Sequence, residues 1–258
     1  MAPRTDRIEI NYVLTFATQF HCGTGIREGL IDRTVVRNNH EYLYIPGSTF
    51  KGVLREKCEQ LARAYVQDAQ EKQRIASPHD AEIALLDLGK RKPTMVTRIF
   101  GSHNVPGSLF FDDALQSEED IPKTDGYKGL QVGLYTQVRI DRPTHTAVSG
   151  ALYTSEFGTK DTEFKGTIQG WLSCVPVEHP AIEHMPRIDL APTYSSLLLL
   201  AGLQLVERLG GNKSTGKGQC ECRITGVTIR EESCPEALWK SWLSQLDVLT
   251  HYHQAVEG

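Results

Sequence analysis

The sequence lacks a long apolar run, since its longest apolar stretch covers only residues 197–203. A membrane-spanning helix needs about 20 apolar residues, so no membrane association is expected. The amino-terminal run MAPRTDRIEI has neither an apolar core nor a small-residue cleavage site, which argues against a secretory signal. We therefore expect a cytoplasmic protein.

An excess of positive charge is also missing. The 258 residues carry 28 Lys and Arg against 32 Asp and Glu, a net charge of -4. This balance excludes the basic surface of many free nucleic-acid-binding proteins but permits a local basic groove. The charges are uneven: 207–230 holds five cations and two carboxylates, and 112–125 holds six carboxylates and one lysine.

The six cysteines form no C-x-x-C pair, and no second cluster completes a zinc site, so no protein-built metal site is expected. Cysteines scattered through a chain of this size indicate reduced thiols. A complete Walker motif is absent as well, because Lys217 is followed by Gly218 instead of Ser or Thr. This disfavours a nucleotide-binding enzyme.

What the sequence does contain is enough apolar residues, 40%, for a packed core. Alternating and helical patterns predict strands at 8–17, 108–114, 135–140, 166–175 and 219–230, and helices after Pro46, at 194–209 and at 235–253. Residues 141–165 are polar and are interpreted as an excursion from the sheet. This order predicts an α+β fold, in which helices cover one face of an antiparallel, ferredoxin-like sheet.

The strongest local feature is a glycine-rich loop at 210–218, with four glycines and two lysines in nine residues. Exposed amides beside lysines can cradle phosphates. A flexible turn after a helix is an equally good interpretation.

A second feature is the start of the helix after Pro46. Ser48 is the predicted N-cap, and Lys51 and Arg55 follow one turn apart. The free amides and positive dipole end of a helix suit a phosphate. An ordinary capped helix with surface cations is the commoner case.

Taken together, these stretches resemble the RAMP superfamily of CRISPR-associated proteins. The matching runs are I-P-G-S-x-x-K-G-x-L-R at 45–55, R-I-F-G at 98–101, I-D-R-P-T at 140–144 and G-G-x-x-S-x-G-x-G at 210–218. They occur in the family's order across nearly the whole chain. The most similar type is the repeated backbone subunit of type III effector complexes.

The resemblance implies one RAMP domain over 1–258, with an RNA-recognition-type palm, a β-hairpin thumb at about 135–165 and a helical tail at about 235–258. It implies that the guide RNA contacts the helix after Pro46 and the glycine-rich loop. The implied RNA-binding residues are Ser48, Lys51, Arg55, Gly211, Lys213, Ser214, Gly216, Lys217 and Gly218. We add His21, Arg33, Arg37, Arg139 and Arg142 as further candidates.

In nuclease-active members of the family, an aspartate in the loop before this helix cleaves the target RNA. Asp32, at the end of the run 29–32, occupies that slot and is the candidate catalytic residue. One carboxylate is enough if the neighbouring 2′-hydroxyl attacks the phosphate, with a divalent cation, Mg²⁺, as the expected cofactor. A loop-capping aspartate is the structural alternative.

The expected partners are crRNA, target RNA, neighbouring copies or paralogous RAMP subunits, and the large and small subunits of a type III complex. Two alternatives stay open. One is an architectural paralogue that binds RNA without cutting it. The other is a stand-alone RAMP endoribonuclease that processes precursor crRNA and would need a histidine as general acid.

Overall fold

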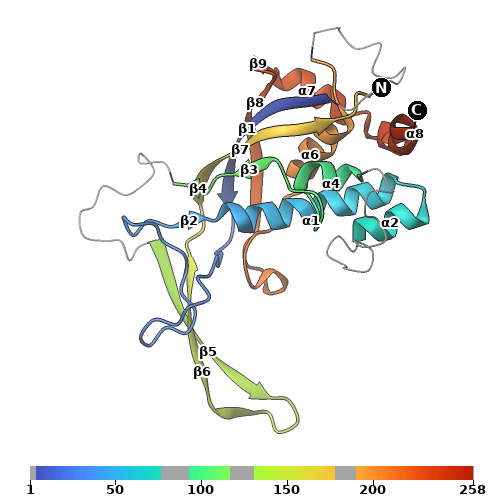
Figure 1. Ribbon diagram of the computed structural model, residues 1–258. Coiled ribbons are helices and arrows are strands. Elements are labelled where there is room, and N and C mark those ends of the chain that lie inside the picture. The colour runs from blue at the N-terminus through green and yellow to red at the C-terminus, as the bar shows by residue number, and fades with distance from the viewer. Residues whose placement is uncertain (1–3, 77–92, 117–130, 178–189, 258) are drawn as a thin grey trace.

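The computed structural model describes residues 4–76, 93–116, 131–177 and 190–257. Its main sheet is antiparallel and has β1 (Arg4–Phe16) at its centre, between β7 (Thr162–Cys174) and β8 (Cys220–Ile229) (Figure 1). Beyond β7 lie three short strands, and one more lies beyond β8. These are β3 (Leu109–Phe111), β4 (Ala114–Leu115), β2 (Tyr44–Ile45) and β9 (Glu232–Ser233).

Strand β1 shows why the sequence folds this way. Five alternate residues of one parity are at most 1% exposed: Ile8, Ile10, Tyr12, Leu14 and Phe16. Side chains alternate across a strand, so these five share one face, and helices cover that face. The expected half-buried strand is confirmed.

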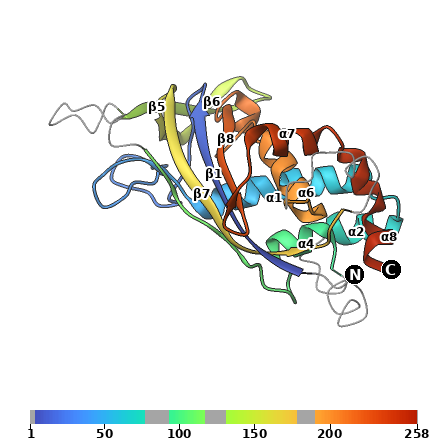
Figure 2. The ribbon, with the colours of Figure 1, turned by 90° about the horizontal axis from the view of Figure 1, so that it is seen from above.

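The helices lie on one side of the sheet (Figure 2). Helix α1 (Gly47–Tyr65) comes directly after β2, and α6 (Tyr194–Gln204) is the next described helix after β7. Helices α2 (Ala69–Ala76) and α4 (Met95–Phe100) pack beside them. The C-terminal segment contains α7 (Glu236–Leu243), η3 (Leu246–His251) and α8 (Tyr252–Glu257). Helix α6 is buried along Tyr194–Leu203, which explains why it is apolar on all sides.

The chain therefore runs strand, helix, strands, helix, strand, and its central strands lie in the order β4-β7-β1-β8. The predicted α+β class, with an antiparallel sheet and helices on one face, is confirmed. Residues 117–125 of the acidic segment lie outside the described residues, as do 77–92 and 178–189.

Three predicted elements differ from the structure. The helix predicted over 235–253 is divided into α7, η3 and α8. The helix predicted over 194–209 stops at Gln204, because Leu209 and Cys220 form backbone hydrogen bonds with Gly218 and Glu207 and so draw 207–209 into a short antiparallel bridge. The strand predicted over 108–114 is divided into β3 and β4, both paired with β7.

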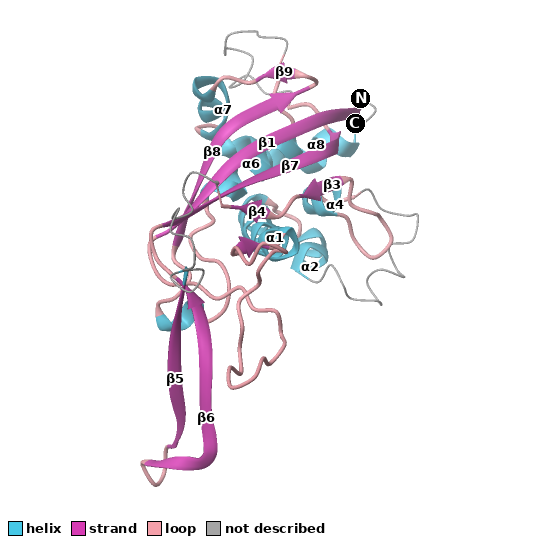
Figure 3. Cartoon of the chain, turned by 90° about the vertical axis from the view of Figure 1, so that its left-hand side faces the viewer, coloured by secondary structure: helices cyan, strands magenta, loops and turns pink. Residues whose placement is uncertain are grey.

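A separate two-stranded sheet projects from the body (Figure 3). It consists of β5 (Val132–Asp141) and β6 (Thr146–Gly158) and is called the hairpin below. Most of the polar segment 141–165 leaves the main sheet, as predicted, and forms β6, but residues 162–165 belong to β7 and pair with β1. The outer part of β6 is exposed on both faces, so it lacks the apolar alternation that marks a half-buried strand.

The start of α1 contradicts the predicted cap. The helix begins at Gly47, and no side chain of its own segment, Ser48 included, caps it. Instead the Gly47 N–H donates to Asp113 Oδ1 at 2.8 Å, so the capping carboxylate comes from the loop between β3 and β4. Gly47 permits this approach, because a Cβ there would lie 2.0 Å from the carbonyl oxygen of Phe111.

We predict that Asp113→Ala lowers the free energy of unfolding by about 1 kcal/mol, the usual cost of losing a helix cap. Ser48→Ala is the matched control and should change it little, because Ser48 is exposed and caps nothing. Urea unfolding followed by circular dichroism measures both. A larger loss for Ser48→Ala than for Asp113→Ala contradicts this assignment.

Candidate functional site

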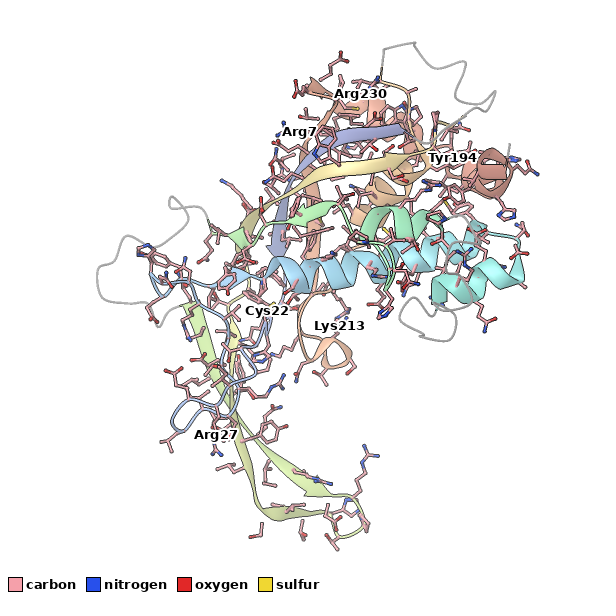
Figure 4. All side chains as sticks on the ribbon, viewed as in Figure 1. Arg7, Cys22, Arg27, Tyr194, Lys213 and Arg230 are labelled. Atoms are coloured by element: carbon pink, nitrogen blue, oxygen red, sulfur yellow. The ribbon has the colours of Figure 1, made fainter. Side chains whose placement is uncertain are left out.

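An open pocket of about 420 Å³ lies where the glycine-rich loop, the start of α1 and the loop after β1 meet. The residues of its lining that matter here are His21, Asp32, Arg33, Thr49, Gly210 and Gly211. The two stretches that the sequence singled out, around 45–55 and 210–218, thus contribute to one pocket. In Figure 4, the labelled Cys22, Arg27 and Lys213 mark the segments around it.

The glycine-rich loop is held tightly at both ends. The Gly211 N–H donates to the His21 carbonyl at 2.8 Å, and the Gly218 N–H donates to the Gln19 carbonyl at 2.7 Å. Gly210 has φ 86°, and a Cβ there would lie 2.5 Å from the His21 oxygen. Both the backbone conformation and the close approach therefore require glycine at 210.

The middle of this loop is exposed. Lys213 and Ser214 are exposed, and Gly216 has open space around it. The N–H groups of Asn212, Lys213 and Ser214 donate no hydrogen bond to any described residue. Lys213 Nζ lies 4.0 Å from Glu56 Oε2 of α1, so the loop also borders this helix. Such a surface offers amides and one ammonium group to an anion.

Asp32 is fixed at the base of the hairpin. Its N–H donates to the Thr154 carbonyl at 2.9 Å, and its Oδ2 accepts from the Thr154 N–H at 2.9 Å. Its Oδ1 lies 3.0 Å from Arg27 Nη2, and the side chain is 25% exposed. The carboxylate is therefore oriented by β6 and still reaches the pocket.

The two arginines after Asp32 have different surroundings. Arg33 lines the pocket, and its Nη1 donates to Asn212 Oδ1 of the glycine-rich loop at 3.0 Å. Arg37 forms a bidentate pair with Glu156, at 3.0 and 3.1 Å, and the Glu156 side chain is only 7% exposed. The guanidinium of Arg37 thus neutralises a buried carboxylate, whereas that of Arg33 faces the pocket.

His21 lines the pocket with a buried side chain, 5% exposed, and does not lie on a loop surface. Its Nδ1 lies 2.8 Å from the Glu156 carbonyl, which can only accept, so Nδ1 carries the proton. Burial lowers the pKa of His21 below its usual value, the nearby Arg33 lowers it further, and the Glu156 carbonyl partly opposes both. The ring is therefore held as a neutral tautomer with Nε2 unprotonated.

Lys217 is enclosed, in contrast to Lys213. Its Nζ lies 4.8 Å from the ring centroid of Tyr135 and 5.2 Å from that of Phe157, both on the hairpin. It also donates to Gln19 Oε1.

The structure does not bring Lys51 and Arg55 to the pocket. Lys51 follows Thr49 by two positions, which turns its side chain by about 200° around α1. Its Nζ lies over the Phe111 ring, 5.6 Å from the centroid. Arg55 pairs with Glu59 at 2.8 Å.

Arg139 and Arg142 lie toward the far end of the hairpin and are exposed. Exposed apolar side chains share this hairpin: Leu134, Val138, Ile140 and Leu152. No sequence motif indicated that these side chains are exposed, although the alternation along 135–140 predicted a strand there. Arg27, Thr154 and Glu156 were also missed, because only the fold brings Arg27 and Thr154 to Asp32 and Glu156 to Arg37.

The described side chains form no cluster of metal ligands. Among the residues that the structure describes, no three His, Cys, Asp or Glu side chains gather as ligands, and Asp32 is the sole carboxylate in the pocket lining. Separately, none of the described helices has the length and apolar character needed to cross a membrane.

Fold and site together define an α+β protein with an antiparallel sheet, whose pocket joins loop amides, a guanidinium and an oriented carboxylate. A sequence model of the RAMP superfamily matches residues 13–221, and this chain belongs to that superfamily. No curated protein matches the sequence.

Two solved structures are similar to the chain at 13% identity. One is the Type III-B Cmr-beta complex in the apo state, with a TM-score of 0.49 over 84% of this chain and 97% of that one. The other is Type III-B Cmr-beta bound to cognate target RNA, with a TM-score of 0.47 over 84% of this chain and 96% of that one.

We predict that Gly210→Ala destabilises the protein more than Gly216→Ala does, by at least ~1 kcal/mol. Both glycines have positive φ, 86° and 83°, but only a Cβ at 210 meets backbone within 4 Å. Thermal unfolding midpoints of the two variants give the difference. Equal losses mean that the loop is not held against His21 as described.

Proposed function

We propose that this RAMP protein is a crRNA-binding backbone subunit of a type III CRISPR ribonucleoprotein, which holds the guide–target duplex and cleaves target RNA at regular intervals. The observation that carries the proposal is the pocket in which the glycine-rich loop, the start of α1 and Asp32 meet. Neighbouring copies or paralogous RAMP subunits, and the large and small subunits of such a complex, are its proposed protein partners.

The fold supports the proposal. A strand-helix-strand-strand-helix-strand order with central strands β4-β7-β1-β8 is that of a ferredoxin-like palm. The hairpin projects from this palm at 132–158, where the family places its thumb. We therefore assign the main sheet to the palm and the hairpin to the thumb.

For the guide RNA, we propose the exposed part of the glycine-rich loop as the main contact. Lys213 and Ser214 are exposed there beside amides that donate to no described residue, and Arg33 faces the same pocket. A phosphate needs donors of this kind. The -4 charge of the chain does not oppose local binding, because a filament shares its guide among many subunits.

For cleavage, we propose that Asp32 accepts the proton of a target 2′-hydroxyl. The 2′-oxygen attacks the adjacent phosphorus and the bond from phosphorus to the 5′-oxygen breaks, which leaves a 2′,3′-cyclic phosphate. The departing 5′-oxygen takes a proton from water. Thr154 orients the carboxylate and Arg33 offsets the phosphate charge, so the protein supplies mainly geometry and proton transfer.

Mg²⁺ is the proposed cofactor, but the pocket lining offers it a single carboxylate, that of Asp32. Such an ion would take its other ligands from RNA phosphates and water, as Mg²⁺ commonly does. When bound, it would neutralise charge on the scissile phosphate.

We predict that Asp32→Asn in the assembled complex abolishes target cleavage and leaves guide RNA bound. The asparagine oxygen can still accept from the Thr154 N–H, so the loop keeps its anchor. Cleavage of end-labelled target RNA and the RNA content of the purified complex are the two measurements. Asp161→Asn, at a carboxylate that is 75% exposed, is the control and should cut normally.

Two outcomes lead to other functions. If Asp32→Asn cuts at the normal rate, or if neither protein cuts, the chain has the architectural role. If the isolated chain cuts repeat RNA by itself, it is a processing nuclease; His21, with Nε2 unprotonated in the pocket lining, could then accept a proton, and the general acid would have to be another residue.

We also predict that Lys213→Met weakens guide binding about equally for all guide sequences and lowers the slope of log affinity against log salt by about 1. Loss of one phosphate contact has this effect. Lys240→Met on α7, another exposed lysine paired with a glutamate, is the matched control. The measurement is the affinity for guide RNA over a range of salt concentrations. If Lys213→Met leaves the slope unchanged, Lys213 does not contact a phosphate of the guide.

A further inference from the structure

Residues 154–158, called the hairpin root below, are where the hairpin joins the body. The loop after β1 holds them at several points. Asp32 exchanges two hydrogen bonds with Thr154, Arg37 pairs with Glu156, and Phe20 exchanges two backbone hydrogen bonds with Gly158. The same contacts therefore fix the candidate catalytic carboxylate and the hairpin.

Phe157 is the apolar member of this root and is only 2% exposed. Its ring packs edge-on against Tyr135 of β5, with centroids 5.4 Å apart and an interplanar angle of 87°. The Lys217 ammonium lies 4.8 Å from the Tyr135 centroid and 5.2 Å from the Phe157 centroid. A cation this close to two ring centroids is attracted by both rings, and more strongly where water is excluded.

Gln19 completes the enclosure. Its side-chain oxygen accepts from Lys217 Nζ, and its side-chain nitrogen donates to the Tyr135 hydroxyl. The backbone next to Lys217 is also anchored, because the Gly218 N–H donates to the Gln19 carbonyl at 2.7 Å. The Lys217 side chain therefore contacts both Gln19, after the end of β1, and the hairpin. The backbone of the neighbouring Gly218 binds Gln19 as well.

We propose that Lys217 is a positioning residue, which ties the glycine-rich loop to the hairpin root and thereby fixes the hairpin, and with it Asp32, relative to the main sheet. The two lysines of the loop then have different roles. Lys213 is 43% exposed and is available to bind an RNA phosphate, whereas Lys217 binds side chains of the hairpin and of Gln19. The consequence for cleavage rests on the proposed function; the anchoring of the hairpin does not.

The first test uses the free, full-length chain and needs no RNA. Lys217→Met keeps the length of the side chain but removes its charge, and it should raise amide hydrogen exchange in 132–138 and 153–158 by roughly tenfold. Lys217→Arg, which can also stack on aromatic rings, should restore most of the protection. Lys213→Met is the matched control from the same loop and should leave exchange in the hairpin unchanged.

A second variant guards against a misfolded Lys217→Met. Tyr135→Leu removes one ring of the enclosure from the partly exposed hairpin and should raise exchange similarly. The double variant should exceed neither single variant by much, because both remove the same contact. Normal protection in Tyr135→Leu, additive effects, or equal exchange in Lys213→Met and Lys217→Met would each overturn the proposal.

In the assembled complex, Lys217→Met should lower the rate of cleavage of bound target at least fivefold, while the salt slope of guide binding stays that of the wild type. A lowered slope would make Lys217 a phosphate contact and overturn the assignment. If the wild-type complex does not cut RNA, the exchange results still decide whether Lys217 anchors the hairpin, so the two proposals fail separately.

Discussion

The rest of the candidate site depends on how the hairpin root, residues 154–158, is held against the body. A two-stranded hairpin has no core of its own, so its direction is set wholly by the contacts where it meets the body. Here those contacts include a buried carboxylate, Glu156, which would be costly without a partner. Arg37 supplies the charge, and the Val35 N–H supplies a further hydrogen bond.

Close approach of backbone segments is the second constraint. The glycine-rich loop reaches the end of β1 because glycines at 210 and 218 bring it within hydrogen-bond distance of His21 and Gln19. Side chains at either position would collide with a carbonyl oxygen. The loop is therefore firm at its two ends and open in the middle. This is the shape expected of a segment that presents amides to a ligand without rearranging.

Charge in this protein is arranged locally. Of the cationic side chains near the pocket, Arg37 and Lys217 are used to hold the hairpin root, whereas Arg33 and Lys213 border the pocket or solvent. An arginine that neutralises a buried carboxylate and a lysine enclosed by two rings each stabilise the fold. The same residue types, a few positions away, remain accessible to an anion. Net charge alone says little about such a division of roles.

Apolar alternation and short glycine-containing runs are local properties, and they were enough to predict the class of the fold and the family. The pattern from Ile8 to Phe16 required a strand with one buried face, and the spacing of 210–218 required an exposed loop. Tertiary structure alone decided which side chains face the pocket. Asp113 replaces Ser48 as the source of the cap, and Lys51 turns away on α1. Lys217 meets two rings more than 50 residues earlier in the chain. These outcomes depend on the distance and direction between segments remote in sequence, which no local pattern encodes.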